Sequence, residues 1–461
     1  MMVNVFDWDL RKLRVIHPAA LILFSYLFAI GAGTFMLLTP YATVEEDISF
    51  IEAMYTATSA VCVTGLTVVD TGTYFSFFGQ LTILLLIQLG GLGIMTVSVM
   101  IFHLVGRKVS FHQRMAMQQT FAKTPRGDLY NLLKSIFLFT GIAELSGAIL
   151  LFIHWSREYA FGEALYLAAF HSVSAFCNAG FSLLSNSFMD YRGALLLNLT
   201  ICGLIVFGGI GFPVVYEIYG QIFREKRRGF KLSVQTKTVL ITTAVLIISG
   251  MFLFLFLESH KTLKECLPGD SWWVALFQSI TCRTAGFNTI DTTELGDATV
   301  ALMIFLMFIG ASPGSCGGGI KTTTIAVLGM FILSRLRSRI RVNMFKKSIP
   351  KETISKSLSI VVLAVCVISM MFFLLLISQQ SELINTATNN EFQSYLFEVV
   401  SAFSTVGLSM GVTADIDKWG KLLIIMTMLI GRVGVLTFSY VIAGAAPLKG
   451  IEYAEENIML G

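Results

Sequence analysis

The sequence predicts an all-α integral membrane protein made of four tandem repeats. Each repeat is a helix, a re-entrant pore helix and a second helix, which gives eight transmembrane helices in a pseudo-fourfold arrangement around one pore. Composition, the lengths of the apolar runs and a motif that occurs four times support this prediction. The 461 residues are 55% hydrophobic and only 13% charged, whereas an average soluble domain has about 25% charged residues. This composition excludes a soluble enzyme, a nucleic-acid-binding protein and a disordered scaffold.

Eight long apolar runs reach or approach the ~20 residues that span a bilayer. They cover residues 18–38, 75–105, 135–153, 194–216, 238–257, 298–334, 358–378 and 422–446. Shorter apolar runs, which are typical of re-entrant segments, lie between them at residues 50–62, 162–177, 271–282 and 392–404. The order long, short, long therefore occurs four times. It divides the chain into a cytoplasmic N-terminus (1–16), pore repeats at 17–106, 107–222 (with a cytoplasmic linker), 223–334 and 335–448, and a cytoplasmic C-terminal tail (449–461).

Each short run ends in a related string that is closed by a glycine. Glycine reaches positive φ freely and adds no side chain, so such loops can point carbonyl oxygens toward a pore axis. A ring of carbonyl oxygens replaces the water shell of a monovalent cation without any charged side chain. We therefore expect a short cation filter. Its candidate residues are Val63, Thr64, Gly65, Asn178, Ala179, Gly180, Thr284, Ala285, Gly286, Thr405, Val406 and Gly407.

The second long run of the third repeat is unlike its counterparts. Residues 310–319 contain five glycines and one proline, which disfavour a straight helix by several kcal/mol and predict an unwound segment within the membrane. We interpret this segment as an intramembrane gate loop (310–320). The alternative is a kinked structural helix in which two cations cap carbonyl groups. The candidate gate residues are Gly310, Ala311, Ser312, Pro313, Gly314, Ser315, Cys316, Gly317, Gly318, Gly319, Lys321 and, in the fourth repeat, Arg432.

Charged residues are distributed unevenly along the chain. Most of the 33 Lys and Arg fall in segments that the repeat places on one side, including 107–134, 224–237 and 335–356. By the positive-inside rule, that side is the cytoplasm, so we expect a multi-pass plasma-membrane protein with both termini cytoplasmic. The seven Cys and six His show no paired or clustered spacing, which predicts neither a disulfide framework nor a transition-metal site.

A few other ionisable residues are weaker candidates. Glu144 lies inside an apolar run and is by default a functional suspect, but a buried, hydrogen-bonded packing role is at least as well supported by its distance from the filter strings. Arg283 is expected to brace its loop from behind, because a cation on the axis would repel cations. The acidic residues Asp70, Asp291 and Asp415 either raise the local cation concentration or are simply solvated.

One filter glycine in each of four repeats of a single chain resembles the Ktr/Trk/HKT superfamily of potassium transporters, in particular the ion-translocating membrane subunits of bacterial Ktr systems. The resemblance implies that the four glycines line a K+ filter and that Gly65, rather than Ser, favours K+ over Na+. It also implies that Arg432 interacts with the gate loop. It further implies a homodimer in the lipid bilayer and a cytosolic regulatory ring of nucleotide-binding subunits, with no cofactor in this chain. Whether Na+ is a modulator or a co-ion stays open.

Other functions remain as alternatives. A sodium-coupled secondary symporter is the first, because such proteins also combine broken helices with internal repeats. A non-selective monovalent cation channel is the second. A membrane enzyme is disfavoured, since no nucleophile–base pairing or phosphate-binding loop is present in the sequence.

Overall fold

The computed structural model describes residues 18–44, 47–94, 96–97, 129–223, 231–265, 269–379 and 391–443. Its main helices are α1 (Pro18–Leu37), α2 (Phe50–Cys62), α3 (Thr71–Tyr74), α4 (Phe77–Leu92), α7 (Leu129–Trp155), α8 (Phe161–Phe176), α9 (Leu195–Ile210), α10 (Phe212–Phe223), α11 (Val234–Glu258), α12 (Asp270–Thr281), α13 (Asp297–Phe308), α14 (Thr322–Leu336), α15 (Lys351–Ser378), α17 (Glu391–Ser404), α18 (Lys418–Val433) and α19 (Val435–Ala443). Short 3-10 helices are η2 (Met189–Tyr191), η3 (Thr262–Glu265) and η4 (Thr292–Glu294). Strands β1 (Asn343–Met344) and β2 (Lys347–Ser348) form one antiparallel hairpin.

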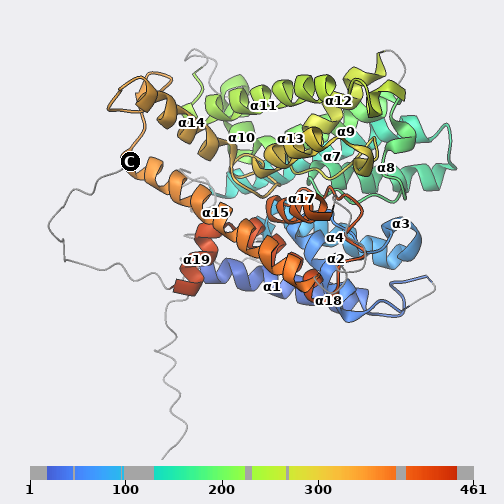
Figure 1. Cartoon of the computed structure of the whole chain (residues 1–461). Helices are drawn as coiled ribbons and strands as arrows, with labels where there is room; N and C mark the ends of the chain where they lie inside the picture. The colour runs from blue at the N-terminus through green and yellow to red at the C-terminus, as the bar shows by residue number, and fades with distance from the viewer. Residues whose placement is uncertain are drawn as a thin grey trace, which may run out of the picture.

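The helices pack as four units in a closed cyclic order. Each unit pairs a long first helix with a short second one: α1 with α2, α7 with α8, α11 with α12, and α15 with α17. The helix that follows each short helix then packs on the short helix of the next unit, α4 on α8, α9 on α12 and α13 on α17, and α18 packs back on α2. In Figure 1, α11 lies along the top of the molecule and α1 along the bottom, with α2 and α17 between them.

The long and short helices differ in what surrounds them. Large apolar side chains on the long helices are exposed, for example Phe28 on α1 (79% exposed) and Phe256 on α11 (78%). The short helix α2 is instead buried along most of its length, and small residues such as Ala57 and Ala60 let its neighbours approach closely. Exposed apolar faces on long helices are what a bilayer solvates, and the buried short helices form the interior.

The expectation of eight transmembrane helices is met only in part. Among the described residues, four helices are long and apolar enough to cross a membrane, and a fifth span results if α9 and α10, which meet at 94°, count as one. The second run of a unit is interrupted at a glycine with positive φ in three units: Gly93 (φ 83°), Gly211 (φ 97°) and Gly434 (φ 92°). These conformations are open to glycine and strained for other residues, so helical hydrogen bonding stops there.

Several expected parts lie outside the described residues. These are the N-terminal segment 1–16, the tail 449–461, and the basic segments 107–128 and 224–230.

Candidate functional site

The same unusual backbone conformation occurs at the end of all four short helices. A non-glycine residue in the left-handed region is followed two positions later by a glycine with positive φ. The pairs are Val63 (57°) with Gly65 (93°), Asn178 (59°) with Gly180 (71°), Thr284 (67°) with Gly286 (79°), and Thr405 (54°) with Gly407 (92°). Positive φ is uncommon for any non-glycine residue and an outlier for a β-branched one. Strained backbone of this kind is concentrated at functional sites.

The four glycines lie next to one another in a ring. A side chain added at Gly65 would overlap the carbonyl oxygen of Ala179, and one at Gly180 would come within 2.9 Å of the carbonyl oxygen of Ala285. The contacts continue around the ring. A Cβ at Gly286 would lie 2.6 Å from the Val406 carbonyl oxygen, and one at Gly407 would overlap that of Thr64. The second, third and fourth units thus each present a backbone carbonyl to the glycine of the preceding unit. The first unit presents its carbonyl to the glycine of the fourth, which closes the ring. We refer to these four strings together as the glycine ring.

Hydroxyl groups on the short helices fix each string locally. In the first and fourth units, the Oγ atoms of Ser59 and Ser401 accept hydrogen bonds from the ring glycines, at 3.1 Å in both cases. In the second and third units, Ser174 and Thr281 donate to the carbonyl oxygen that follows the glycine, at 2.8 and 2.5 Å. We did not predict these clamps from the sequence. A serine six positions before the glycine in three of the four strings was the available signal.

A cavity of about 320 Å³ opens on one side of the glycine ring, and all four ring glycines line it. Asp70 and Asp291 also line it, as expected of residues that could attract cations. One oxygen of each carboxylate accepts a backbone N–H group, from Gly72 at Asp70 Oδ1 (2.8 Å) and from Thr293 at Asp291 Oδ1 (2.8 Å). The third acid, Asp415, is not among the lining residues. This cavity is called the outer vestibule below.

The segment after α13 is unwound, as expected from its glycines and proline. No helix covers residues 309–321, and an isolated parallel bridge joins Ile309 to Ile320 where the segment enters and leaves. Backbone bonds attach it to the second unit, with Ser312 N–H donating to Gly209 O (3.1 Å) and Phe212 N–H donating to Gly314 O (2.9 Å). The segment is therefore a compact loop with partners for its backbone groups.

This loop packs directly on the glycine ring. Gly318 N–H donates to the Thr405 hydroxyl (2.9 Å), and a Cβ at Gly317 would overlap the hydroxyl of Thr284. Thr284 and Thr405 are the left-handed residues of the third and fourth strings. The glycines at 317 and 318 thus permit a contact that any side chain would prevent.

Two cations that are far from each other in the sequence hold the loop in place. Lys321 donates from Nζ to Gly317 O at 2.8 Å and to Gly318 O at 3.4 Å. The guanidinium of Arg432 donates to Cys316 O in the loop and to Gly90 O at the end of α4. The structure therefore brings the expected pair to the loop. We did not predict the role of Gly90, because nothing in its own sequence neighbourhood points to Arg432.

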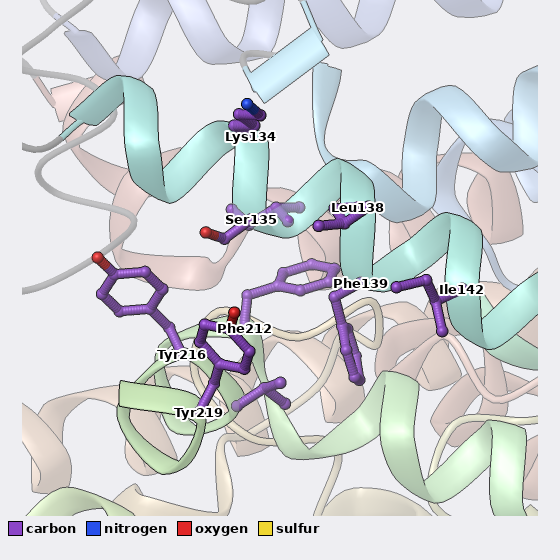
Figure 2. A pocket seen from close by; sticks show the side chains of 10 residues that line it. Lys134, Ser135, Leu138, Phe139, Ile142, Phe212, Tyr216 and Tyr219 are labelled. Carbon is purple, nitrogen blue, oxygen red and sulfur yellow. The ribbon is translucent and has the colours of Figure 1, made fainter. Parts of the chain in front are cut away.

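A second cavity, of about 310 Å³, lies against the loop. It is lined by Pro313, Gly314 and Ser315 of the loop, by Lys321 and Arg432, and by residues of α1 and α4, but by no ring glycine. The loop thus contacts the glycine ring on one side and this inner cavity on the other. A third cavity of similar volume lies between α7 and α10, with the aromatic residues Phe139, Phe212, Tyr216 and Tyr219 in its wall (Figure 2). None of its lining residues belongs to the ring or the loop.

The remaining ionisable candidates lie behind the ring. Glu144 accepts a hydrogen bond from Gln88 Nε2 (3.3 Å), and Gln88 in turn accepts one from Cys177 (3.5 Å), next to the second string. This is the hydrogen-bonded packing role that was one of the two expectations. Arg283 is 6% exposed and lines a small cavity with Thr243 and Gly209, on α11 and α9. It is absent from the lining of the outer vestibule, in agreement with a position behind its loop.

A closed ring of backbone carbonyls at the ends of four buried helices, inside a shell of exposed apolar helices, defines a membrane protein of the cation-transporting class. The sequence matches the family TrkH, described as cation transport protein, over residues 22–448. The chain belongs to this family.

Individual relatives support the same assignment. The chain is 38% identical to "Ktr system potassium uptake protein B" of Vibrio alginolyticus over 96% of this chain and 94% of the relative. It is 34% identical to "Potassium/sodium uptake protein NtpJ" of Enterococcus hirae over 98% and 99%. The crystal structure of the potassium transporter TrkH from Vibrio parahaemolyticus superposes with a TM-score of 0.70 at 19% identity, covering 95% of this chain and 86% of that one. This last similarity shows the shared fold.

Proposed function

We propose that the protein takes up K+ across the plasma membrane through one pore, with the glycine ring as its selectivity filter and the loop at 310–320 as its gate. The observation that carries this proposal is the closed ring, in which a carbonyl from each unit meets the glycine of its neighbour. Relatives that share over a third of their residues with the chain are named for potassium uptake.

In the proposed filter, a K+ ion sheds water in the outer vestibule and is coordinated by the carbonyl oxygens of the ring. The four short helices end at the ring, so their partially negative C-terminal ends favour a cation there. No carboxylate is required at the ring itself, because rings of carbonyl dipoles suffice for monovalent cations. The ring offers a single layer of glycines, which is why we propose a short filter.

In the proposed gate, the loop obstructs the path between the ring and the inner cavity. Its contact with Thr405 on one side and the inner cavity on the other supports this position. Lys321 and Arg432 fix the closed loop by hydrogen bonds to three of its carbonyl groups. Lys321 donates to those of Gly317 and Gly318, and Arg432 donates to that of Cys316. Opening then requires those bonds to break, and the loop to leave the ring.

For the assembly, we propose eight transmembrane crossings in pseudo-fourfold arrangement, with the broken second runs each completing one crossing. Both termini are then cytoplasmic. We also propose a homodimer and a cytosolic ring of nucleotide-binding regulatory subunits. The cyclic helix packing supports the first proposal, and the relatives named as parts of a Ktr system support the presence of a further subunit.

Sodium is the basis of the second candidate function. One relative is named for potassium and sodium uptake, so Na+ could enter as a co-ion in a sodium-coupled symport, permeate a non-selective pore, or act as a modulator. These possibilities differ in whether Na+ moves with K+, and a flux measurement distinguishes them.

The test is ion uptake into liposomes that contain the purified protein, with K+ and Na+ supplied in turn and together. The parent should prefer K+, and Gly65→Ser should lower that preference, because a hydroxymethyl group at Gly65 would meet the Ala179 carbonyl oxygen. Gly31→Ser is the matched control, since a Cβ at Gly31 would have no neighbour within 4 Å. Unchanged selectivity in Gly65→Ser would contradict the filter, and Na+ uptake that depends on K+ would favour symport.

A further inference from the structure

A basic hairpin joins the third and fourth units, and it is unlike any other described surface of the molecule. It comprises residues 335–351, from the last turn of α14 through β1 and β2 to the first residue of α15. This stretch carries seven cations and no acid. They are Arg335, Arg337, Arg339, Arg341, Lys346, Lys347 and Lys351, and all are exposed. None forms a salt bridge with any acid in the described part of the chain.

The basic hairpin is a packed structure and not a loose connection. Val342 (4% exposed) and Met344 (7%) anchor it toward α14. Ile349 N–H donates to Val342 O (2.9 Å), and the Ser348 hydroxyl donates to Asn343 Oδ1 (2.7 Å). The backbone positions that carry its cations are therefore fixed with respect to the helices. In Figure 1 it lies beyond the ends of α14 and α15, at the left edge of the molecule.

Apolar side chains are exposed among these cations. Leu336 is 77% exposed and Ile340 is 84% exposed, and each stands between arginines in the sequence. Such exposed apolar groups are unfavourable in water but are well placed at the boundary between headgroups and acyl chains. Long basic side chains next to them can reach the headgroups, as they do at the ends of membrane helices.

The neighbouring helices place this surface at that boundary. On α14, the exposed apolar residues Ile332 and Leu333 lie three and two positions before Arg335, and on α15 the exposed Leu358 follows Lys351 by seven positions. At 1.5 Å per residue, that is roughly 10 Å along the helix. The basic hairpin therefore begins where the lipid-facing surfaces of two helices end.

We propose that the basic hairpin is a binding surface for anionic phospholipid headgroups of the bilayer that surrounds the protein, with Leu336 and Ile340 inserted at the acyl boundary. Charge complementarity selects an anionic lipid, and the alternation of apolar and basic residues selects a membrane surface over a soluble acidic partner. Because it connects α14, which follows the gate loop, to α15, bound lipid would restrain the helix that starts at Thr322. The proposal rests on membrane insertion alone and is independent of the filter and gate.

The first experiment counts retained lipids. The full-length protein, reconstituted in mixed phosphatidylglycerol and phosphatidylcholine, is released into mild detergent, and bound phosphatidylglycerol is measured by native mass spectrometry. The variant Arg337→Gln/Arg339→Gln/Arg341→Gln should lose affinity by about fivefold for each cation removed. The matched control Lys261→Gln/Lys264→Gln/Lys418→Gln removes three exposed cations elsewhere and should retain the parental amount. Equal retention by both variants overturns the proposal.

The second experiment covers the case in which the triple variant fails to fold. Ile340→Trp places a fluorophore at an exposed position and leaves every cation in place. Brominated phosphatidylglycerol should quench its fluorescence beyond the quenching of the parental tryptophans, and brominated phosphatidylcholine should quench it less. No added quenching with either lipid overturns the proposal. Loss of binding to a cytosolic protein by the arginine variants, with lipid retention unchanged, would instead identify a protein-docking surface and also overturn it.

Discussion

The glycine ring and the loop at 310–320 lie in contact, but they are held in place by different means. In the ring, each string is fixed by a hydroxyl group from the short helix that carries it, as Ser59 fixes Gly65 and Ser401 fixes Gly407, at a separation of six residues. In the loop, Lys321 bonds locally to Gly317 and Gly318, but further side-chain bonds come from far away in the sequence. Thr405 contacts Gly318 across 87 residues, and Arg432 contacts Cys316 across 116.

This difference indicates which part can move. Each of the four strings has a short-range clamp, so its backbone is supported by the short helix that carries it. The loop occurs in one unit alone. Besides the bonds of Lys321 within that unit, its position depends on hydrogen bonds to the second and fourth units. A displacement between units would break these bonds without disturbing the clamps of the ring. The predictions below separate the two kinds of support.

The largest effect is expected from placing a side chain inside the glycine ring. Gly407→Ala should abolish K+ uptake, because the new Cβ would overlap the Thr64 carbonyl oxygen and lie 3.0 Å from Gly65 Cα. Gly269→Ala is the control for backbone strain. Gly269 also has positive φ (113°), but a Cβ there would have no neighbour within 4 Å. The substitution Gly269→Ala should therefore lower the free energy of unfolding by about 1–3 kcal/mol and leave K+ uptake intact. Liposome flux and thermal unfolding measure the two effects, and equal flux in the two variants would show that ring crowding is unimportant.

An intermediate effect is expected from releasing the loop. Arg432→Ala removes charged hydrogen bonds to Cys316 O and Gly90 O. Only the bond to Cys316 attaches the loop, and one such bond contributes about 1.5–3 kcal/mol, so the open population and the K+ flux should rise by roughly tenfold to a hundredfold. Arg192→Ala, at an exposed arginine, should leave the flux unchanged. A folded Arg432→Ala protein with lower flux would mean that the loop is a structural kink whose carbonyls the cation caps.

The smallest effect is expected at the contact between the two regions. Thr405→Val keeps the shape but removes the acceptor for Gly318 N–H, which should weaken the closed loop by about 1 kcal/mol and raise the flux by about fivefold. Thr56→Val is the matched control, because its buried hydroxyl has no hydrogen-bond partner among the described residues. It should be neutral. If both variants behave alike, the threonine does not couple the ring to the loop.

The sequence predicted well what depends on local pattern. The apolar runs located the long helices α1, α11 and α15, and the repeated strings located Gly65 and its three counterparts. The glycines and proline of 310–319 predicted the unwound loop. These features follow from composition and spacing within a few turns of chain, where hydropathy and backbone freedom act directly.

Apart from the unwound loop of the third repeat, the breaks in the second runs were not predicted. An apolar run such as 194–216 satisfies the length rule for a membrane helix, yet the chain turns by 94° between α9 and α10. The turn is at Gly211, where a Cβ would lie 2.5 Å from the Pro313 carbonyl oxygen of the gate loop. Hydropathy cannot anticipate this break, because the contact involves a segment about a hundred residues away.

The sequence by itself determined that this chain enters a membrane and contains four glycine-closed strings, since both depend on residue type and order. Only the tertiary structure decided that the strings meet as one ring, that Arg432 joins Cys316 to Gly90, and that the loop lies against Thr405. The physical reason is that a carbonyl oxygen is present at every residue and carries no sequence signature. Which carbonyl faces which glycine or cation is decided only when the four units pack together.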